Sequence, residues 1–487
     1  MGETGNRYLQ ENFAPVRQEV TLTQLPVAGS IPEFLDGRYV RNGPNPVLEP
    51  NPSTYHWFLG TGMVHGIRIR QGNVEWYRNR WVRSSDVAKA LGEPIHPGPV
   101  HARFDFSANT HVIGHAGRTF ATVEAGGRPY ELTEELETVG PCDFDGTLPG
   151  GYTAHTKRDP STGELHGVSY FFGWGNRVQY SVLGTDARIK RTVDVEVSGS
   201  PMMHDFSLTE KHVVFYDLPV TFDAAMASTS VPDALSAPAR SVFSHVVGRR
   251  RIPKKVTATM MRLGGNSVFP YSWNPDYPAR VGVMDRLGDG RDVKWMDIEP
   301  CYVFHPVNAY ENGEQIVADV VRHEKMFATD QSGPNEGAPT LERWRIDLAA
   351  GKVFEERIDD RGQEFPRHDE RLTGRCYRYG YTVGLDTTTD GNLDASGTLY
   401  KHDFLTERID MRDFGSDCSV GEFVFVPAGG DAREDEGVLM GFVYDSCAHR
   451  SDLVLLDAET LEIVAEVLLP IRVPHGLHGS WIPAEAS

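Results

Sequence analysis

Seven times along the chain, a short strand pattern is followed by a tight polar turn and a second strand pattern. Each copy places alternating apolar residues on both sides of its turn, so it presents an apolar face that a neighbour must bury. Such a series, about 60 residues apart with irregular insertions, predicts the outer strands of a seven-bladed β-propeller, an all-β fold. A β-sandwich with appended domains is the alternative. The copies begin at His65, Arg128, Val178, Ala279, Glu342, Thr398 and Asp452.

The longest interruption lies between the third and fourth copies. We therefore expect one propeller domain over residues 1–487 with a cap insertion at about 219–275. Within it, VPDALSAPARSVFSHVVGRRRIPKKV from Val231 predicts an amphipathic helix with a basic end. Such a segment either rests on an anionic membrane surface or packs as an ordinary cap with its charges in water. Its expected apolar side comprises Leu235, Val242, Phe243, Val246 and Val247.

The net charge and the cysteine pattern exclude some classes of protein and indicate a cellular location. With 68 acidic and 48 basic residues, the formal charge of −20 argues against a nucleic-acid binder. The five cysteines are scattered without a CxxC pair, which indicates reduced thiols in a cytoplasmic protein. No apolar run approaches the roughly 18 residues that a membrane span needs. The expected location is the cytoplasm. Any membrane contact is expected to be peripheral and to involve the cap.

Four of the 18 histidines lie in dense apolar or glycine-flanked stretches at predicted strand ends. No two of them form a local HxH or HExxH motif. In a propeller, however, the inner strand of every blade faces one central axis, so distant histidines can meet on one ion. Imidazole ligands suit Fe(II), Cu, Ni or Zn, and ligand type alone leaves the metal open. The four are His155, His204, His305 and His478.

Three isolated acids are candidates for supporting such a site. Glu124, Glu364 and Glu422 each lie in an apolar or small-residue neighbourhood, where a carboxylate needs a partner if it is buried. Carboxylates commonly accept hydrogen bonds from the free N–H groups of metal-bound imidazoles. The alternative for each is an exposed glutamate at a strand edge.

Six segments of the chain resemble, in the same order, motifs of the carotenoid cleavage oxygenases, and the resemblance runs from about Gly37 to Pro483. The segments are GRYVRNGPNP from Gly37, HWFLGTGMVHG from His56, TAHTKRDPSTGEL from Thr153, MHDFSLTEKHVVFYD from Met203, FHPVNAYENG from Phe304 and GLHGSW from Gly476.

This resemblance implies a seven-bladed propeller with a dome of loops and short helices over one face. It implies Fe(2+) held by the four histidines, with the three glutamates hydrogen-bonded to three of them and O2 as co-substrate. The expected reaction cleaves a C=C bond of a carotenoid or apocarotenoid into two carbonyl products, with no catalytic residue beyond the metal centre. The C-terminal strand should return to the ring beside N-terminal strands, so that His478 completes the site.

The substrate class is less constrained than the metal site. Family members that cleave stilbenes or phenylpropenes are expected to place a lysine just before the first supporting acid, where this chain has Val123. An apolar side chain there cannot bind a phenolate, which favours a long polyene. The segment NSVFPYSW supplies further candidate tunnel residues, whose alternative role is ordinary core packing. These are Phe269, Tyr271 and Trp273.

Two other functions remain open. A catalytically silent propeller that only binds a ligand would keep the blades and lose metal ligands, yet all four histidines are present. A retinoid isomerase would share the fold and the iron site, so the residues alone do not separate it from an oxygenase.

Overall fold

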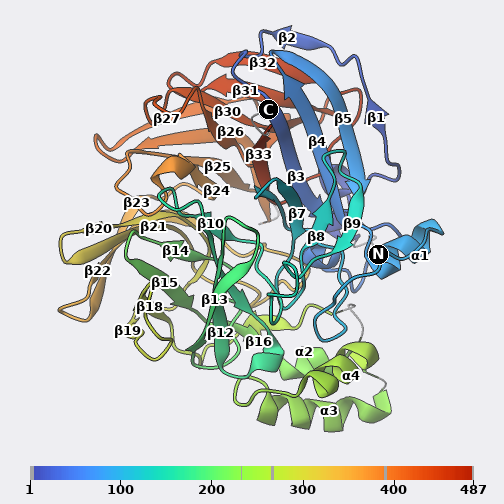
Figure 1. Cartoon of the computed structure of the whole chain (residues 1–487), viewed down its shortest axis with the longest axis vertical. Helices are drawn as coiled ribbons and strands as arrows, with labels where there is room; N and C mark the ends of the chain where they lie inside the picture. Colours follow the sequence, from blue (N-terminus) through green and yellow to red (C-terminus); the bar gives the residue numbers. More distant parts are fainter. Residues whose placement is uncertain (1–4, 232, 265–267, 389–391, 485–487) are drawn as a thin grey trace.

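The computed structural model describes residues 5–231, 233–264, 268–388 and 392–484. In these ranges the strands form seven sheets around a common axis and one additional two-stranded sheet (Figure 1). Within each of the seven sheets the pairing is antiparallel, and the inner strands of neighbouring sheets contact one another. The predicted seven-bladed β-propeller is therefore confirmed.

From the axis outward, the first sheet contains β33 (Gly479–Pro483), β3 (Gly37–Pro44), β4 (Gly62–Arg70), β5 (Asn73–Trp81) and β1 (Thr21–Leu22). In the same direction, the second sheet contains β6 (His111–His115), β7 (Arg118–Thr122), β8 (Tyr130–Leu132) and β9 (Thr138–Pro141). The third contains β10 (Thr156–Arg158), β11 (Leu165–Tyr170), β12 (Arg177–Leu183) and β13 (Ile189–Glu196).

The remaining four sheets follow the same order. The fourth contains β14 (Phe206–Leu208), β15 (His212–Asp217), β18 (Arg280–Asp285) and β19 (Lys294–Asp297). The fifth contains β20 (Tyr302–Asn312), β21 (Gln315–His323), β22 (Thr340–Asp347) and β23 (Lys352–Asp359). The sixth contains β24 (Gln363–His368), β25 (Tyr379–Thr387), β26 (Leu393–Asp403) and β27 (Arg408–Asp413). The seventh contains β28 (Cys418–Val420) and β29 (Val424–Pro427), then β30 (Gly437–Asp445), β31 (Arg450–Asp457), β32 (Ile463–Leu468) and β2 (Val27–Gly29).

Short helices connect these strands. The 3₁₀ helices are η1 (Arg7–Leu9), η2 (Glu11–Phe13), η3 (Trp57–Leu59), η4 (Phe172–Trp174) and η5 (Glu370–Leu372). Helix α1 (Ser85–Leu91) follows β5.

All seven predicted hairpins are present, and each forms an outer pair of its sheet: β4–β5, β8–β9, β12–β13, β18–β19, β22–β23, β26–β27 and β31–β32. The β22–β23 turn shows why such a sequence folds this way. The Asp347 carboxylate accepts hydrogen bonds from the backbone N–H groups of Ala349 and Ala350. Gly351 then adopts φ +64°, a left-handed conformation that glycine reaches without a steric penalty.

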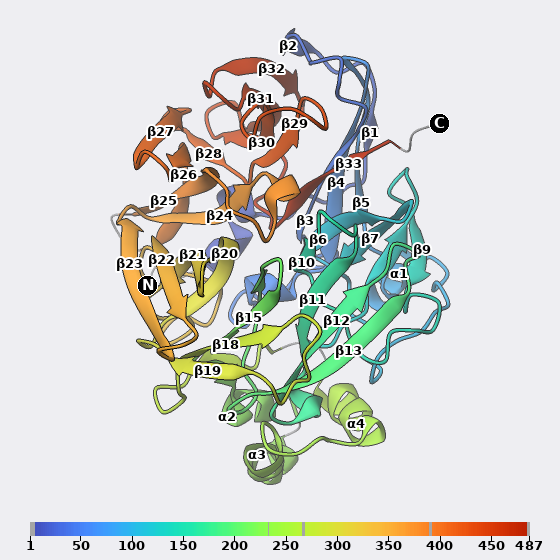
Figure 2. The ribbon, with the colours of Figure 1, turned by 60° about the vertical axis from the view of Figure 1, so that its left-hand side comes forward.

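Both ends of the chain close the ring (Figure 2). Strand β33 pairs antiparallel with β3, in a register that runs from Gly37 opposite Pro483 to Arg41 opposite Gly479. The predicted return of the C-terminal strand is therefore confirmed. Near the other end of the chain, β2 pairs with the outer edge of β32. Because these edges are paired, they are not open to other chains.

The approach of the C-terminal segment to β3 requires small residues. A Cβ atom added to Gly43 would lie 2.6 Å from the Cα atom of Gly476, which is backbone and cannot move aside. We expect Gly43→Ala to lower the free energy of unfolding by about 1–3 kcal/mol through this overpacking. Urea denaturation measures the loss. Gly430→Ala is the control, since nothing lies within 4 Å of its Cβ position, and equal stability of the two variants would contradict the prediction.

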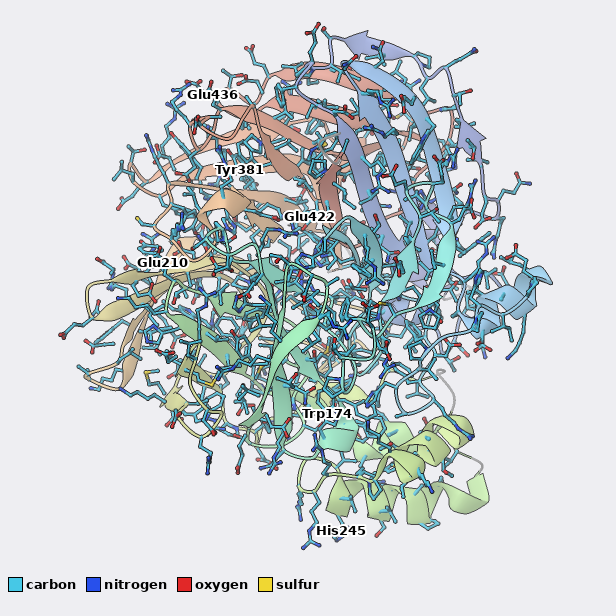
Figure 3. All side chains as sticks on the ribbon, in the orientation of Figure 1. Trp174, Glu210, His245, Tyr381, Glu422 and Glu436 are labelled. Atoms are coloured by element: carbon cyan, nitrogen blue, oxygen red, sulfur yellow. The ribbon has the colours of Figure 1, made fainter. Side chains whose placement is uncertain are left out.

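Between β15 and β18 the chain leaves the fourth sheet. This excursion contains β16 (Val220–Phe222), α2 (Ala224–Ser228), α3 (Asp233–Val246), α4 (Lys254–Gly264) and β17 (Tyr271–Trp273). Strands β16 and β17 pair with each other, and the three helices lie together at one end of the molecule (Figure 1). Figure 3 shows His245 of α3 on the outer surface of this group.

The predicted amphipathic segment divides into the end of one helix and the start of another. Helix α3 ends at Val246, and Arg249 to Arg251 lie in the connection to α4. Phe243 is buried, whereas its neighbour Val242 is 55% exposed, so these two predicted members of one apolar side do not share an environment. The side chain of Leu235 lies outside the described residues. Membrane contact through the cap stays a prediction.

Two further observations bear on the class of protein. Among the described residues, no helix has the length and apolar character needed to cross a membrane. All five cysteines are free thiols, as predicted.

Candidate metal centre

Four innermost strands deliver the four predicted histidines to the axis. His155 directly precedes β10, His204 lies two residues before β14, His305 lies in β20 and His478 directly precedes β33. The pairing of β20 with β21 shifts register between Val303 and Pro306. Such a bulge redirects a side chain, here the one at His305. Strands from four different sheets therefore place one imidazole each at the same end of the ring.

The four imidazoles converge and are buried. One nitrogen from each lies within 4.8 Å of one nitrogen from every other. Nε2 of His204 lies 3.2 Å from Nε2 of His305. None of the four residues is more than 8% exposed. Backbone bonds fix the last of them: the N–H of His478 donates to the carbonyl of Thr110 at 3.1 Å, and its own carbonyl accepts from the N–H of Asn42 at 3.0 Å.

Each of the three predicted glutamates contacts a different histidine. The carboxylate of Glu124 lies 2.8 Å from Nδ1 of His204, that of Glu364 lies 2.7 Å from Nδ1 of His305, and that of Glu422 lies 3.0 Å from Nδ1 of His478. A carboxylate accepts from an N–H group, so Nδ1 carries the proton and the lone pair is left on Nε2. All three glutamates are buried, and Figure 3 shows Glu422 near the middle of the molecule.

A further layer of partners, which sequence reasoning missed, holds these carboxylates. The Tyr170 hydroxyl donates to Glu124 at 3.0 Å, and Nε2 of His323 lies 3.1 Å from Glu364. Glu422 accepts from the backbone N–H of Gly479 at 2.7 Å and lies 3.8 Å from the Arg367 guanidinium. Tyr170, His323 and Arg367 lie in strands without a distinctive local motif. Only the signal of a buried polar residue in an apolar run could have indicated Tyr170 or His323.

His155 is supported differently from the other three. Its Nδ1 lies 3.8 Å from the Asp205 carboxylate, beyond hydrogen-bond distance, and Asp205 is paired with Lys157 at 2.7 Å. Burial, together with the charges of His204, His478 and His305, lowers the pKa of His155 well below its ordinary value. This imidazole is therefore neutral at physiological pH and able to act as a metal ligand.

Two of the supporting carboxylates, those of Glu364 and Glu422, are held in the ionised form. Burial alone would raise the pKa of Glu422, but Arg367 and His478 outweigh it and hold this pKa at about 2. Burial would also raise the pKa of Glu364, but His305 and His323 outweigh this effect and lower the pKa below its ordinary value. Ionised acceptors keep the imidazole protons on Nδ1.

The residues at this site fit a divalent transition metal. Three histidines carry their proton on Nδ1, so their Nε2 lone pairs face the centre. Nε2 of His155 and Oε1 of Glu124 are buried and lie 3.3 Å apart, but neither makes a hydrogen bond, a costly arrangement that a bound cation would relieve. Three carboxylate charges opposed by Arg367 leave a net negative environment for a dication. We infer that these four histidines would hold the metal.

A cavity of about 280 Å³ adjoins the histidines and is mostly apolar. Phe243 and Met260 of the cap helices and Tyr8 and Phe13 near the N-terminus are among its lining residues. Three predicted tunnel residues, Val123, Phe269 and Tyr271, line it. Trp273 is not among the lining residues and packs against the hydrophobic core around Phe206 and Phe215 instead. For Trp273 the structure favours the core-packing alternative.

Residues 13–483 match the family model described as retinal pigment epithelial membrane protein, RPE65. A curated carotenoid cleavage oxygenase from Mycobacterium tuberculosis is 55% identical over 495 residues, which cover 99% of this chain and 98% of the relative. The chain belongs to the carotenoid cleavage oxygenase family. The resemblance inferred from six motifs is therefore confirmed over nearly the whole chain.

This member of the carotenoid cleavage oxygenase family is similar in structure to two solved enzymes whose names indicate different substrates. The lignostilbene dioxygenase of Pseudomonas brassicacearum superposes with a TM-score of 0.80 at 25% identity and covers 98% of each chain. Cobalt-substituted apocarotenoid oxygenase of Synechocystis has a TM-score of 0.78 at 25% identity, covering 96% of this chain and 97% of that one.

Proposed function

We propose that the protein is a non-haem Fe(II) dioxygenase that cleaves one C=C bond of a carotenoid or apocarotenoid into two carbonyl products. The observation that carries this proposal is the set of four buried histidines with converging nitrogens at the wall of an apolar cavity. These histidines would hold the ion beside a cavity in which an apolar substrate can lie.

When bound, iron would supply the activation of O2. The protein's own groups would orient the ligands and exclude water. Glu124, Glu364 and Glu422 hold the Nδ1 protons of three imidazoles, which fixes the ring planes and raises the basicity of Nε2. Both oxygen atoms of O2 enter the products, one in each new carbonyl, so no proton needs to be transferred. The proposal therefore assigns no acid or base.

The cavity wall supports an elongated apolar substrate. Aromatic side chains of Phe58, Phe269 and Phe304 lie close together, with ring centroids 5.9 Å apart for Phe58 and Phe269 and 6.2 Å apart for Phe58 and Phe304. Val123, only 6% exposed, occupies the position where a phenol-cleaving member is expected to carry a lysine. A polyene gains from burial against such a wall, whereas a phenolate would lose its hydration without compensation.

One observation favours the second candidate, a stilbene- or phenylpropene-cleaving dioxygenase. The Tyr271 side chain lines the cavity, and within the described residues no hydrogen bond from its hydroxyl to the protein is found. A substrate phenol would provide a partner for this hydroxyl.

Product analysis separates these candidates. Iron-loaded protein is incubated under ¹⁸O₂ with an apocarotenal and, in a parallel reaction, with a hydroxystilbene, and the products are identified by mass spectrometry. We expect two label-bearing carbonyl products from the apocarotenal. Cleavage of the stilbene alone would support the second candidate, whereas a rearranged alcohol would indicate an isomerase and absence of turnover a binding protein.

A further inference from the structure

A second cavity lies on the propeller axis beyond the four histidines. Four inner strands continue from site residues into it: β10 after His155, β20 after His305, β24 after Glu364 and β33 after His478. We call this space, of about 530 Å³, the axial chamber. Its lining is about half polar, whereas the cavity on the other side of the histidines is mostly apolar, and no cap residue lines it.

The axial chamber is basic in an acidic protein. Seven lysine and arginine side chains line it against three aspartate and glutamate side chains, although the whole chain carries a formal charge of −20. Positive charge concentrated in a cavity with low-dielectric walls attracts anions.

Five of these seven cations have a carboxylate within ion-pair distance, for example Arg118 with Glu131 and Arg371 with Asp369. Arg38 and Arg158 are the exceptions within the described part of the chain. Arg38 donates to the backbone carbonyl of Glu134 at 3.0 Å and to the Thr119 hydroxyl at 3.1 Å.

Arg158 is likewise held by neutral acceptors. Its guanidinium donates to the carbonyls of Gly114 at 2.8 Å and Gly163 at 3.2 Å and lies 3.2 Å from Nδ1 of His115. These neutral contacts position the guanidinium without cancelling its charge.

The two arginines contact two residues that are paired with each other in the second sheet. Gly114, which accepts from Arg158, is the antiparallel pairing partner of Thr119, which accepts from Arg38. A guanidinium has five N–H groups, and these contacts use two on Arg38 and three on Arg158. Five N–H groups of the two guanidinium groups are therefore not used by these contacts and remain for a ligand.

Burial makes this arrangement costly when no anion is present. Arg38 is only 8% exposed, and burial lowers its pKa because no nearby carboxylate compensates fully. An oxyanion that accepts bidentate bonds from both guanidinium groups would offset this cost.

We propose that a small dianion of the hydrogen-phosphate type binds between Arg38 and Arg158 in the axial chamber. This site is separate from the metal centre and does not depend on the proposed oxygenase reaction.

Inorganic phosphate is the probe, titrated calorimetrically into the iron-loaded full-length chain at constant ionic strength. We expect saturable binding of one phosphate per chain. Arg158→Gln should weaken it at least tenfold. Arg118→Gln, which removes a chamber cation already paired with Glu131, should change it less than twofold. Absence of saturable binding to the wild type, or an equal loss in both variants, would overturn the proposal.

A second measurement needs no variant. Phenylglyoxal modifies accessible arginines, and the extent at each site is read by mass spectrometry of proteolytic peptides. Phosphate should slow modification of the half-buried Arg158 several-fold and leave Arg291, whose side chain is 90% exposed, unchanged. An equal rate at Arg158 with and without phosphate would overturn the proposal even if Arg158→Gln does not fold.

Discussion

Replacing His305 by alanine is expected to abolish stoichiometric iron binding and all measurable cleavage while the propeller stays folded. The substitution removes one of four converging nitrogens and leaves Glu364 buried with only His323 as an imidazole partner. Loss of a residue that merely supports a metal ligand typically costs about 10–100-fold in metal affinity, so loss of a ligand should exceed that range. Iron content by mass spectrometry and turnover of an apocarotenal measure the two effects.

His402→Ala is the matched control for this experiment. His402 is also buried, at 1% exposure, but its Nε2 lies 3.1 Å from the Thr382 hydroxyl, away from the four converging histidines. This variant should lose some stability and keep one iron per chain. If His305→Ala retained a full complement of iron, the assignment of His305 would be wrong.

Removing residues 478–487 should eliminate iron binding and destabilise the fold together. The deletion takes away His478 and all of β33, so the edge of β3 loses its partner from Gly37 to Arg41. Loss of the buried Ile482 side chain alone should lower the free energy of unfolding by about 2–5 kcal/mol. Iron content and urea denaturation of the truncated chain are the measurements.

Two further variants separate the loss of iron binding from the loss of stability. His478→Ala in the full-length chain should lose iron but keep most of the stability, because β33 is intact. Deleting only residues 485–487 leaves β33 whole and should preserve both properties. Stoichiometric iron in the chain that lacks residues 478–487 would refute the dual role of the C-terminal strand.

The outer half of the fold was predictable from the sequence, whereas the inner half was less so. Hairpins such as β22–β23 have alternating apolar residues in both strands and a short turn with a glycine at its left-handed position. Both features can be recognised in the sequence. Inner strands such as β10 and β14 span three residues each, too few for periodicity. Strand β2 is also three residues long, and it joins the last sheet only through the closure of the ring.

The metal centre shows the same division. Four histidines and three glutamates could be named because each lies in an apolar or glycine-flanked stretch of the sequence, and the family resemblance implies their roles. Arg367 and His323 could not, since their roles arise only when strands from different sheets place them beside Glu422 and Glu364. Trp273 lies two residues from Tyr271 and was expected in the tunnel, but it packs into the core. Residue type alone does not separate a cavity wall from the core behind it.

The central claim is that four histidines from four sheets bind one metal ion. Anomalous diffraction at the iron absorption edge, from crystals of the iron-loaded protein, tests it most directly. We predict a single strong peak per chain, within bonding distance of one nitrogen each from His155, His204, His305 and His478. A peak bonded to two or fewer of these imidazoles, or no peak between them, would contradict the claim.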